Sequence, residues 1–189
     1  MELRIERLTT DIINDFFCFF ENAAFTDHEE WANCYCLEPH IGYADDEGFR
    51  DRAARRAKAA ELIESGAMQG YLAYHGDEVV GWCNANDKMN FPIINGDDAF
   101  RTLDCGAGVI KSVYCFDIAP EWRGRQMSSL ILDRVCEDAK RDGYSYIECY
   151  PFTDTTEQYQ YHGTKGLYVR HGFEFVKNVY VFDIMQKKL

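Results

Sequence analysis

The segment from Val109 to Tyr150 limits the folds open to this chain more than any other. A strand pattern over 109–118 leads through a short loop into a helix pattern over 126–141, and a second strand pattern follows over 146–150. Two strands joined through a helix of this length normally pair in parallel, with a right-handed crossover. The sequence therefore predicts an α/β protein that contains a parallel strand pair.

The flanking segments predict antiparallel strands and further helices. Strand patterns over 70–75 and 78–84 enclose Gly76-Asp77, a dipeptide that favours a tight hairpin. We also expect a strand over 3–8, helices over 10–22, 49–65 and 166–170, and one or two strands over 173–184. The predicted fold class is α/β, with a mixed twisted sheet and helices on both faces. The length of 189 residues suits a single domain over 1–189.

Residues 86–108 have no clear period and are rich in Asn, Asp and Gly. Linkers of this length without secondary structure are uncommon and often form functional lids. The alternative is a partly ordered excursion anchored by Phe91, Ile93 and Ile94.

The charge of the chain restricts its partners. A formal net charge of −12 argues against nucleic acid, because such binding needs a dense cationic surface. An acidic protein instead favours a cationic partner such as a free amine. No apolar run approaches the ~18 residues that span a membrane, and the first residues lack a signal-peptide pattern. We therefore expect a cytoplasmic protein without a membrane or nucleic-acid partner.

Eight cysteines are predicted to be free, mostly buried thiols, since no export signal is present and the chain can form a large core. Cys34 and Cys36 lie between His28 and His40, which raises the alternative of a zinc site. The spacing His-x5-Cys-x-Cys-x3-His matches no usual zinc pattern. Ordinary thiols in a substrate loop are the preferred interpretation, and no metal is expected.

The loop before the 126–141 helix has the composition of an anion site. Amides at a helix start have no partners within the helix, and the helix dipole adds positive potential there. Gly124 allows a ligand to approach the backbone closely, and Arg123 and Arg125 add positive charge. The alternative is a solvated basic turn. The nucleotide-binding motifs Gly-x-Gly-x-x-Gly and Gly-x4-Gly-Lys-Ser/Thr do not occur.

Two motifs carry a family resemblance. The loop Arg123-Gly-Arg-Gln-Met-Ser128 resembles the Arg/Gln-x-x-Gly-x-Gly/Ala signature of Gcn5-related N-acetyltransferases, and Leu167 to Phe173 is similar to their Leu-Tyr-x-x-x-Gly-Phe segment. The resemblance implies the sheet of acyl-CoA N-acyltransferases and acetyl-CoA as co-substrate. Gln126 departs from it, because the family usually has Gly there. If that position requires a positive φ, Gln costs on the order of 1 kcal/mol.

The resemblance also implies where CoA binds. The pyrophosphate would contact the loop and helix start, namely Arg123, Gly124, Arg125, Gln126, Met127, Ser128 and Ser129. The pantetheine arm would lie in a gap between the 109–118 and 146–150 strands, bonded to the backbone of Phe116, Asp117 and Ile118.

Candidate catalytic and acceptor residues follow from the same resemblance. Tyr168 is the candidate acid for the departing CoA sulfur; the alternative is an aromatic packed on a short helix. Glu148 is the candidate base, although it could equally face solvent or pair with a structural cation. Asp117, His162 and a water chain are alternatives. Trp31, Tyr35 and His162 are expected to line the acceptor site.

The predicted function is transfer of the acetyl group of acetyl-CoA to a primary amine, by direct attack in a ternary complex. A small-molecule amine is preferred, because the chain is acidic and has no additional recognition domain. The alternative is a non-catalytic acyl-CoA-binding module in which Gln126 marks a degenerate phosphate loop. Dimers are frequent in similar proteins, so a homodimer is a further expectation.

Overall fold

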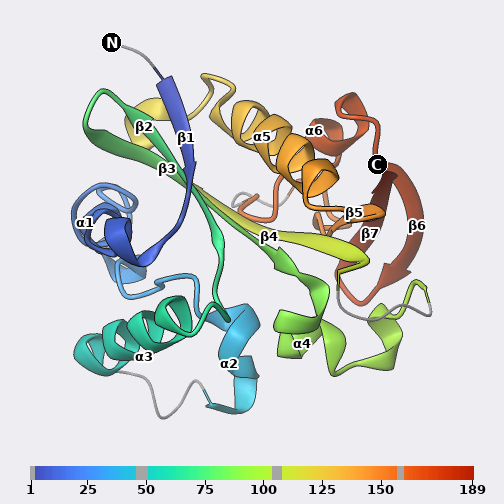
Figure 1. Cartoon of the computed structure of the whole chain (residues 1–189), viewed down its shortest axis with the longest axis horizontal. Coiled ribbons are helices and arrows are strands. Elements are labelled where there is room, and N and C mark those ends of the chain that lie inside the picture. The colour runs from blue at the N-terminus through green and yellow to red at the C-terminus, as the bar shows by residue number, and fades with distance from the viewer. Residues whose placement is uncertain (1–2, 46–50, 104–107, 157–159) are drawn as a thin grey trace.

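The computed structural model describes residues 3–45, 51–103, 108–156 and 160–189, and gives side-chain surroundings for these except 42–45. Seven strands form one sheet in the order β1-β2-β3-β4-β5-β7-β6 (Figure 1). They are β1 (Leu3–Arg7), β2 (Gly70–His75), β3 (Glu78–Asp87), β4 (Ile110–Ile118), β5 (Tyr146–Cys149), β6 (Glu174–Val179) and β7 (Phe182–Lys188). β4 and β5 pair in parallel, and the other neighbours are antiparallel. The predicted mixed sheet is confirmed.

The helices agree with the sequence pattern and add two more. They are α1 (Ile13–Asn22), α2 (Glu38–Asp45), α3 (Arg52–Glu64), α4 (Pro92–Asn95), α5 (Met127–Arg141) and α6 (Lys165–Arg170). α2 and α4 were not expected as helices. Within the described residues, no helix combines the length and apolar character needed to cross a membrane.

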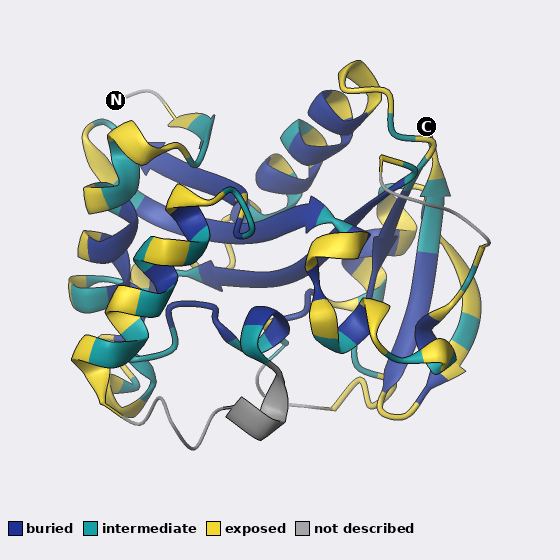
Figure 2. Ribbon diagram, turned by 60° about the horizontal axis from the view of Figure 1, so that its bottom comes forward, coloured by how far each residue is buried: buried dark blue, intermediate teal, exposed yellow. Residues whose placement is uncertain are grey.

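Helices cover both faces of the sheet, as predicted. On one face, four buried phenylalanines of α1 pack towards β3, with the rings of Phe16 and Trp82 4.9 Å apart. On the other face, Ile131 and Val135 of α5 share an apolar cluster with Val113 of β4. The strands between these layers are buried almost throughout (Figure 2). Two apolar layers thus enclose the sheet.

The region over 86–108 is a partly ordered excursion rather than a structureless lid, over the residues that the structure describes. Phe91 and Ile94 are buried and anchor it, as the second interpretation predicted. Its aspartates cap short turns: Asp87 accepts from the Met89 N–H at 2.9 Å, and Asp97 accepts from the Ala99 N–H at 2.8 Å. These local bonds explain how a polar stretch folds.

β4 separates from β5 along its second half. The two strands pair only from Ile110 to Val113 on the β4 side. A bulge follows, because Asn84 of β3 opposes Cys115 while Ala85 opposes Val113, which leaves Tyr114 without a counterpart. The second half of β4 therefore has one edge that β5 does not cover.

Candidate functional site

The loop between β4 and α5 is shaped by two left-handed residues. Gly124 has a φ of 74° and Gln126, the N-cap residue of α5, has a φ of 63°. Position 126 therefore does require a positive φ, and a residue other than glycine there costs about 1–2 kcal/mol. Gln126 forms no side-chain cap bond, so the first amides of the 15-residue α5, near Ser128 and Ser129, lack that partner. The Met127 side chain is buried, so only its backbone can contact a ligand.

The two arginines of the loop differ. Arg123 donates from Nε to the Ile118 carbonyl at 3.0 Å and forms an ion pair with Asp27, whose pKa is lowered by this hydrogen bond. Arg123 thus ties the loop to the segment after α1. Arg125 is exposed and lies over the Trp122 ring, 5.1 Å from its centroid. Arg125 is therefore the more accessible cation for a phosphate.

The uncovered edge of β4 is contacted by the segment Gln160–Gly163. The Phe116 N–H donates to the Tyr161 carbonyl at 2.6 Å. His162 Nδ1 donates to the Tyr114 carbonyl at 2.6 Å, since a carbonyl can only accept. The segment therefore lies along the path predicted for the pantetheine arm.

Asp117 differs in orientation from Phe116 and Ile118. The Ala119 N–H donates to the Val80 carbonyl of β3, and backbone groups alternate along a strand. The backbone of Asp117 therefore faces β3, whereas that of Phe116 and Ile118 faces the uncovered edge. The expectation that the Asp117 backbone binds pantetheine does not fit this register.

Tyr168 is fully buried within α6, a helix that Thr164 caps. Its hydroxyl donates to the His162 carbonyl at 2.6 Å. Burial raises the pKa of Tyr168, so the phenol remains protonated. The phenol therefore carries the proton that an acid would need. In this arrangement its hydroxyl is hydrogen-bonded to the His162 carbonyl.

Glu148 has no capacity left to act as a base. Its Oε1 accepts from Lys88 Nζ at 2.6 Å and from the Tyr150 hydroxyl at 2.7 Å. Its Oε2 accepts from the Thr102 hydroxyl at 2.6 Å and from Gln186 Nε2 at 2.7 Å. A carboxylate has about four lone-pair sites, and all are occupied. The surroundings are those of the alternative interpretation, a carboxylate paired with a structural cation, so we withdraw the base role for Glu148.

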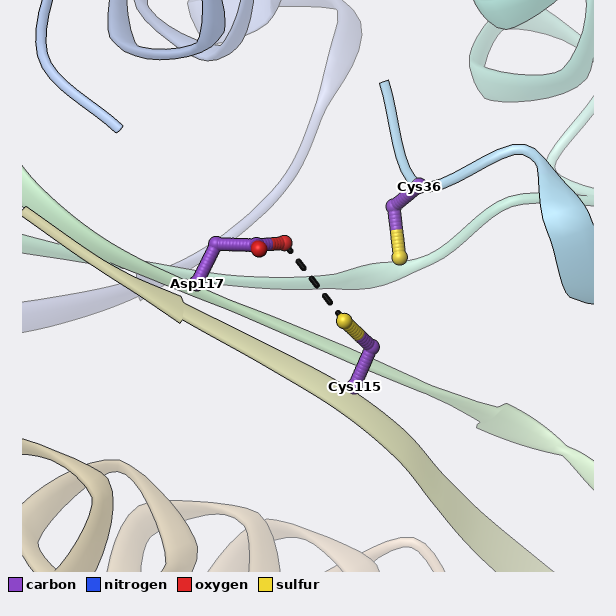
Figure 3. Close-up of side chains that lie close together, drawn as sticks. All are labelled: Cys36, Cys115 and Asp117. Carbon is purple, nitrogen blue, oxygen red and sulfur yellow. Dashed lines mark hydrogen bonds between the residues drawn. The ribbon is translucent and has the colours of Figure 1, made fainter. Parts of the chain in front are cut away.

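Cys36, Cys115 and Asp117 meet on the face of the sheet opposite α5 (Figure 3). Their sulfur and carboxylate atoms all lie within 4.8 Å of one another, and all three side chains are buried. The Cys115 thiol donates to Asp117 Oδ2 at 3.5 Å. Burial raises the pKa of Asp117 to about 6. Cys115 and Asp117 are two positions apart on one strand and so lie on the same face, which the sequence could have indicated. The sequence could not have indicated that Cys36 approaches them.

The predicted acceptor residues Trp31 and Tyr35 have separate surroundings. Tyr35 is fully buried, donates to Glu21 at 3.0 Å and accepts from Arg52 Nε at 3.2 Å. Trp31 is half-buried and stacks on His28, with ring centroids 4.1 Å apart. Tyr35 is thus a core residue, because its large ring gains more from packing on α1 than from facing a ligand.

His162, the third predicted acceptor residue, is fully buried in an aromatic enclosure. Its ring centroid lies 4.7 Å from that of Tyr114, 4.8 Å from Phe152 and 5.0 Å from Phe182. Burial lowers the pKa of His162 to about 4, so the ring is neutral near pH 7. Its Nε2 is buried and has no hydrogen-bond partner among the described residues. Tyr159, three positions before His162 in the same loop, lies outside the described residues.

The zinc alternative raised from the sequence does not assemble from its four residues. His28 Nδ1 pairs with Glu30 at 3.1 Å, while His40 Nε2 bonds to the Asn84 amide at 3.0 Å. Of the four, Cys36 joins a different group, with Cys115 and Asp117 of β4.

The fold and site together define a class of protein. A seven-stranded mixed sheet, whose one parallel pair separates beside the loop that leads into α5, is the architecture of acyl-CoA N-acyltransferases. The chain belongs to the acetyltransferase (GNAT) family, whose model matches residues 25–173. Acyl transfer from acetyl-CoA is therefore the general reaction class of this protein.

Solved structures support the fold. The PaiA N-acetyltransferase of Thermoplasma acidophilum, in complex with coenzyme A, is 15% identical over 100% of both chains, with a TM-score of 0.61. An aminoglycoside N-acetyltransferase with CoA is 12% identical over 95% of this chain and 92% of that one, with a TM-score of 0.60. The protein yncA of Salmonella typhimurium, solved with acetyl-CoA, is 17% identical over 99% of this chain and 94% of that one, with a TM-score of 0.54. Among curated proteins, none matches this sequence.

Proposed function

We propose that this protein transfers the acetyl group of acetyl-CoA to a primary amine of a small molecule. The observation that carries the proposal is the start of α5, a 15-residue helix whose N-cap residue forms no side-chain cap bond. A turn with two left-handed residues precedes it, and the uncovered edge of β4 lies beside it. The amides from Gly124 to Ser129 would bind the pyrophosphate, helped by the helix dipole and Arg125. Arg123 holds the loop in place through Asp27.

The pantetheine arm would follow the edge of β4, bonded to the backbone of Phe116 and Ile118. This requires the segment Gln160–Gly163 to move, because the Tyr161 carbonyl occupies the Phe116 N–H. The bond itself supports the assignment: a carbonyl oxygen already accepts from this amide. The thioester carbonyl would replace it, and the Phe116 N–H would stabilise the negative charge that develops there.

The same movement would release the acid. When the His162 carbonyl leaves, the Tyr168 hydroxyl loses its acceptor and can donate to the CoA sulfur. The amine, having given one proton to water, attacks the thioester carbon. A C–N bond forms, the C–S bond breaks and the sulfur takes the Tyr168 proton. The nitrogen of the new amide then loses its extra proton, which returns through solvent to the Tyr168 phenolate. Because all the lone pairs of Glu148 are occupied, it takes no part.

A thermal-shift series with acetyl-CoA, free CoA and ATP tests the proposal. Ligand at ~100 times its dissociation constant adds ~2.7 kcal/mol of stability, or roughly 5–10 °C for a chain of this size. We expect both CoA species, and not ATP, to raise the melting temperature. The absence of any shift would contradict CoA binding. A shift without turnover over a panel of small amines would favour the non-catalytic acyl-CoA-binding alternative.

A further inference from the structure

Cys36, Cys115 and Asp117 form a buried cluster that acyl transfer as proposed does not use (Figure 3). Cys36 lies in the turn before α2, and the other two residues lie on β4. Each side chain is at most 7% exposed. Fold formation thus brings two thiols and a carboxylate together from segments far apart in the sequence.

The backbone turns sharply to bring Cys36 into this cluster. Tyr35 and Cys36 both have left-handed conformations, with φ values of 44° and 49°. Two consecutive left-handed residues other than glycine are unfavourable, and such strain concentrates at functional sites. This left-handed turn directs the buried Cys36 sulfur towards Cys115 (Figure 3).

Neighbouring polar groups contact the Cys36 sulfur. Asn84 Nδ2 donates to Cys36 Sγ at 3.2 Å, and the same amide bonds to His40 Nε2 at 3.0 Å. Metal ligands commonly have such hydrogen-bonded outer partners, which fix their orientation. Asn84 and His40 are therefore placed as a supporting layer behind Cys36.

Charge balance gives the strongest reason to expect a ligand. Asp117 forms no ion pair within the described parts of the chain, and its hydrogen-bond donor is the Cys115 thiol. Burial of an ionised carboxylate costs free energy unless a nearby cation compensates the charge. Glu148, which is fully buried, has Lys88 for this purpose.

We propose that Cys36, Cys115 and Asp117 bind a zinc ion through two sulfurs and one carboxylate oxygen, with water in the fourth position. Sulfur, sulfur and oxygen are a donor set that suits Zn²⁺. Neighbouring ligands in a tetrahedral site with Zn–S bonds of about 2.3 Å lie roughly 3.5–3.8 Å apart. The observed limit of 4.8 Å therefore requires a contraction of about 1 Å. Binding converts two thiols to thiolates and releases their protons to solvent.

The test measures metal directly and does not depend on catalysis. Full-length protein is reduced, loaded with excess Zn²⁺ and dialysed, and its zinc is measured by plasma mass spectrometry. We expect about one zinc per chain for the native sequence, and less than about a tenth of that for Cys36→Ser, Cys115→Ser and Asp117→Asn. Cys83→Ser is the matched control, because Cys83 is a buried thiol in the α5-side cluster, and it should retain full zinc.

A second measurement uses only the native sequence, so it stands even if a variant misfolds. Cobalt replaces zinc in such sites, and coordination by thiolates gives a sulfur-to-cobalt charge-transfer band with the strong visible bands of a four-coordinate ion. Absence of these bands, or equal zinc in native protein and the Cys115→Ser variant, would overturn the proposal. So would loss of two titratable thiols with a mass two units lower, because Cys36 and Cys115 would then form a disulfide.

Discussion

Two buried polar regions of the sheet contrast in how fully their groups are paired. Around Glu148 on β5, a cation and three neutral donors occupy both carboxylate oxygens. Beside the separated half of β4, Asp117 has one thiol donor, and His162 Nε2 has no partner among the described residues. Pairing in the first region is complete within the chain, as expected of a structural network. In the second it is incomplete, as expected where a ligand supplies the missing partners.

The largest change in stability should come from removing the cation that pairs with Glu148. Replacing Lys88 with Met leaves the Glu148 carboxylate buried without its cation, which should lower the free energy of unfolding by about 3–5 kcal/mol. In metal-free protein, Asp117→Asn should be neutral or stabilising, because it removes a buried charge that has no cation. Urea unfolding measures both. If the two variants were destabilised equally, the contrast between the regions would be wrong.

A pH titration sharpens the comparison at His162. Its pKa is about 4 in the folded protein, against an ordinary value of 6.5. The unfolded chain therefore takes up the proton first, and the stability present above pH 6.5 is lost as pH falls towards 4. The loss attributable to this residue is about 3 kcal/mol. His162→Asn should flatten the stability curve between these pH values. An unchanged curve would show that His162 is not buried in its neutral form.

Tyr168→Phe separates chemistry from binding at the same edge of β4. The variant removes the candidate acid and also the hydroxyl that holds the His162 carbonyl. We expect kcat to fall by about 100-fold, with CoA affinity equal or higher. Steady-state kinetics and calorimetric titration with CoA measure the two effects. Unchanged kcat would remove Tyr168 from the mechanism, and lost CoA affinity would indicate that its role is to form the site.

The sequence predicts what local patterns encode. The crossover between β4 and β5, the hairpin and the loop before α5 follow from periodicity and turn residues. The positive φ at Gln126 was stated only as a condition, and the structure meets it. Partners that lie far apart in the sequence were missed. Lys88 and Glu148 are 60 positions apart, and no local pattern links them. Cys36 meets Cys115 only because the sheet and the turn before α2 are packed together.

Tyr35 and the segment Gln160–Gly163 show a second limit. The family resemblance placed Tyr35 at the acceptor site, but its ring is buried in the core, where Glu21 and Arg52 pair with its hydroxyl. The segment after β5 was expected to border the acceptor site. It bonds to the edge of β4 through the Tyr161 carbonyl and the His162 side chain. The first of these bonds is between backbone groups and depends on no side chain that a sequence could reveal.

Gly163→Ala tests whether that segment closes the CoA path. Gly163 has a φ of 77°, and an added Cβ would lie 2.8 Å from the Tyr168 hydroxyl, so the substitution disfavours the closed arrangement. We expect a stability loss of about 1–2 kcal/mol. If CoA binds only after the segment has left, the same penalty no longer opposes binding, and affinity should rise roughly 5- to 30-fold. Gly172→Ala is the matched control, because Gly172 has a φ of 80° with nothing within 4 Å of the added Cβ. It should lose comparable stability without a gain in affinity. If both variants bind CoA as the native chain does, the segment is a fixed part of the fold, and the pantetheine arm must take a path that leaves the Phe116–Tyr161 bond in place.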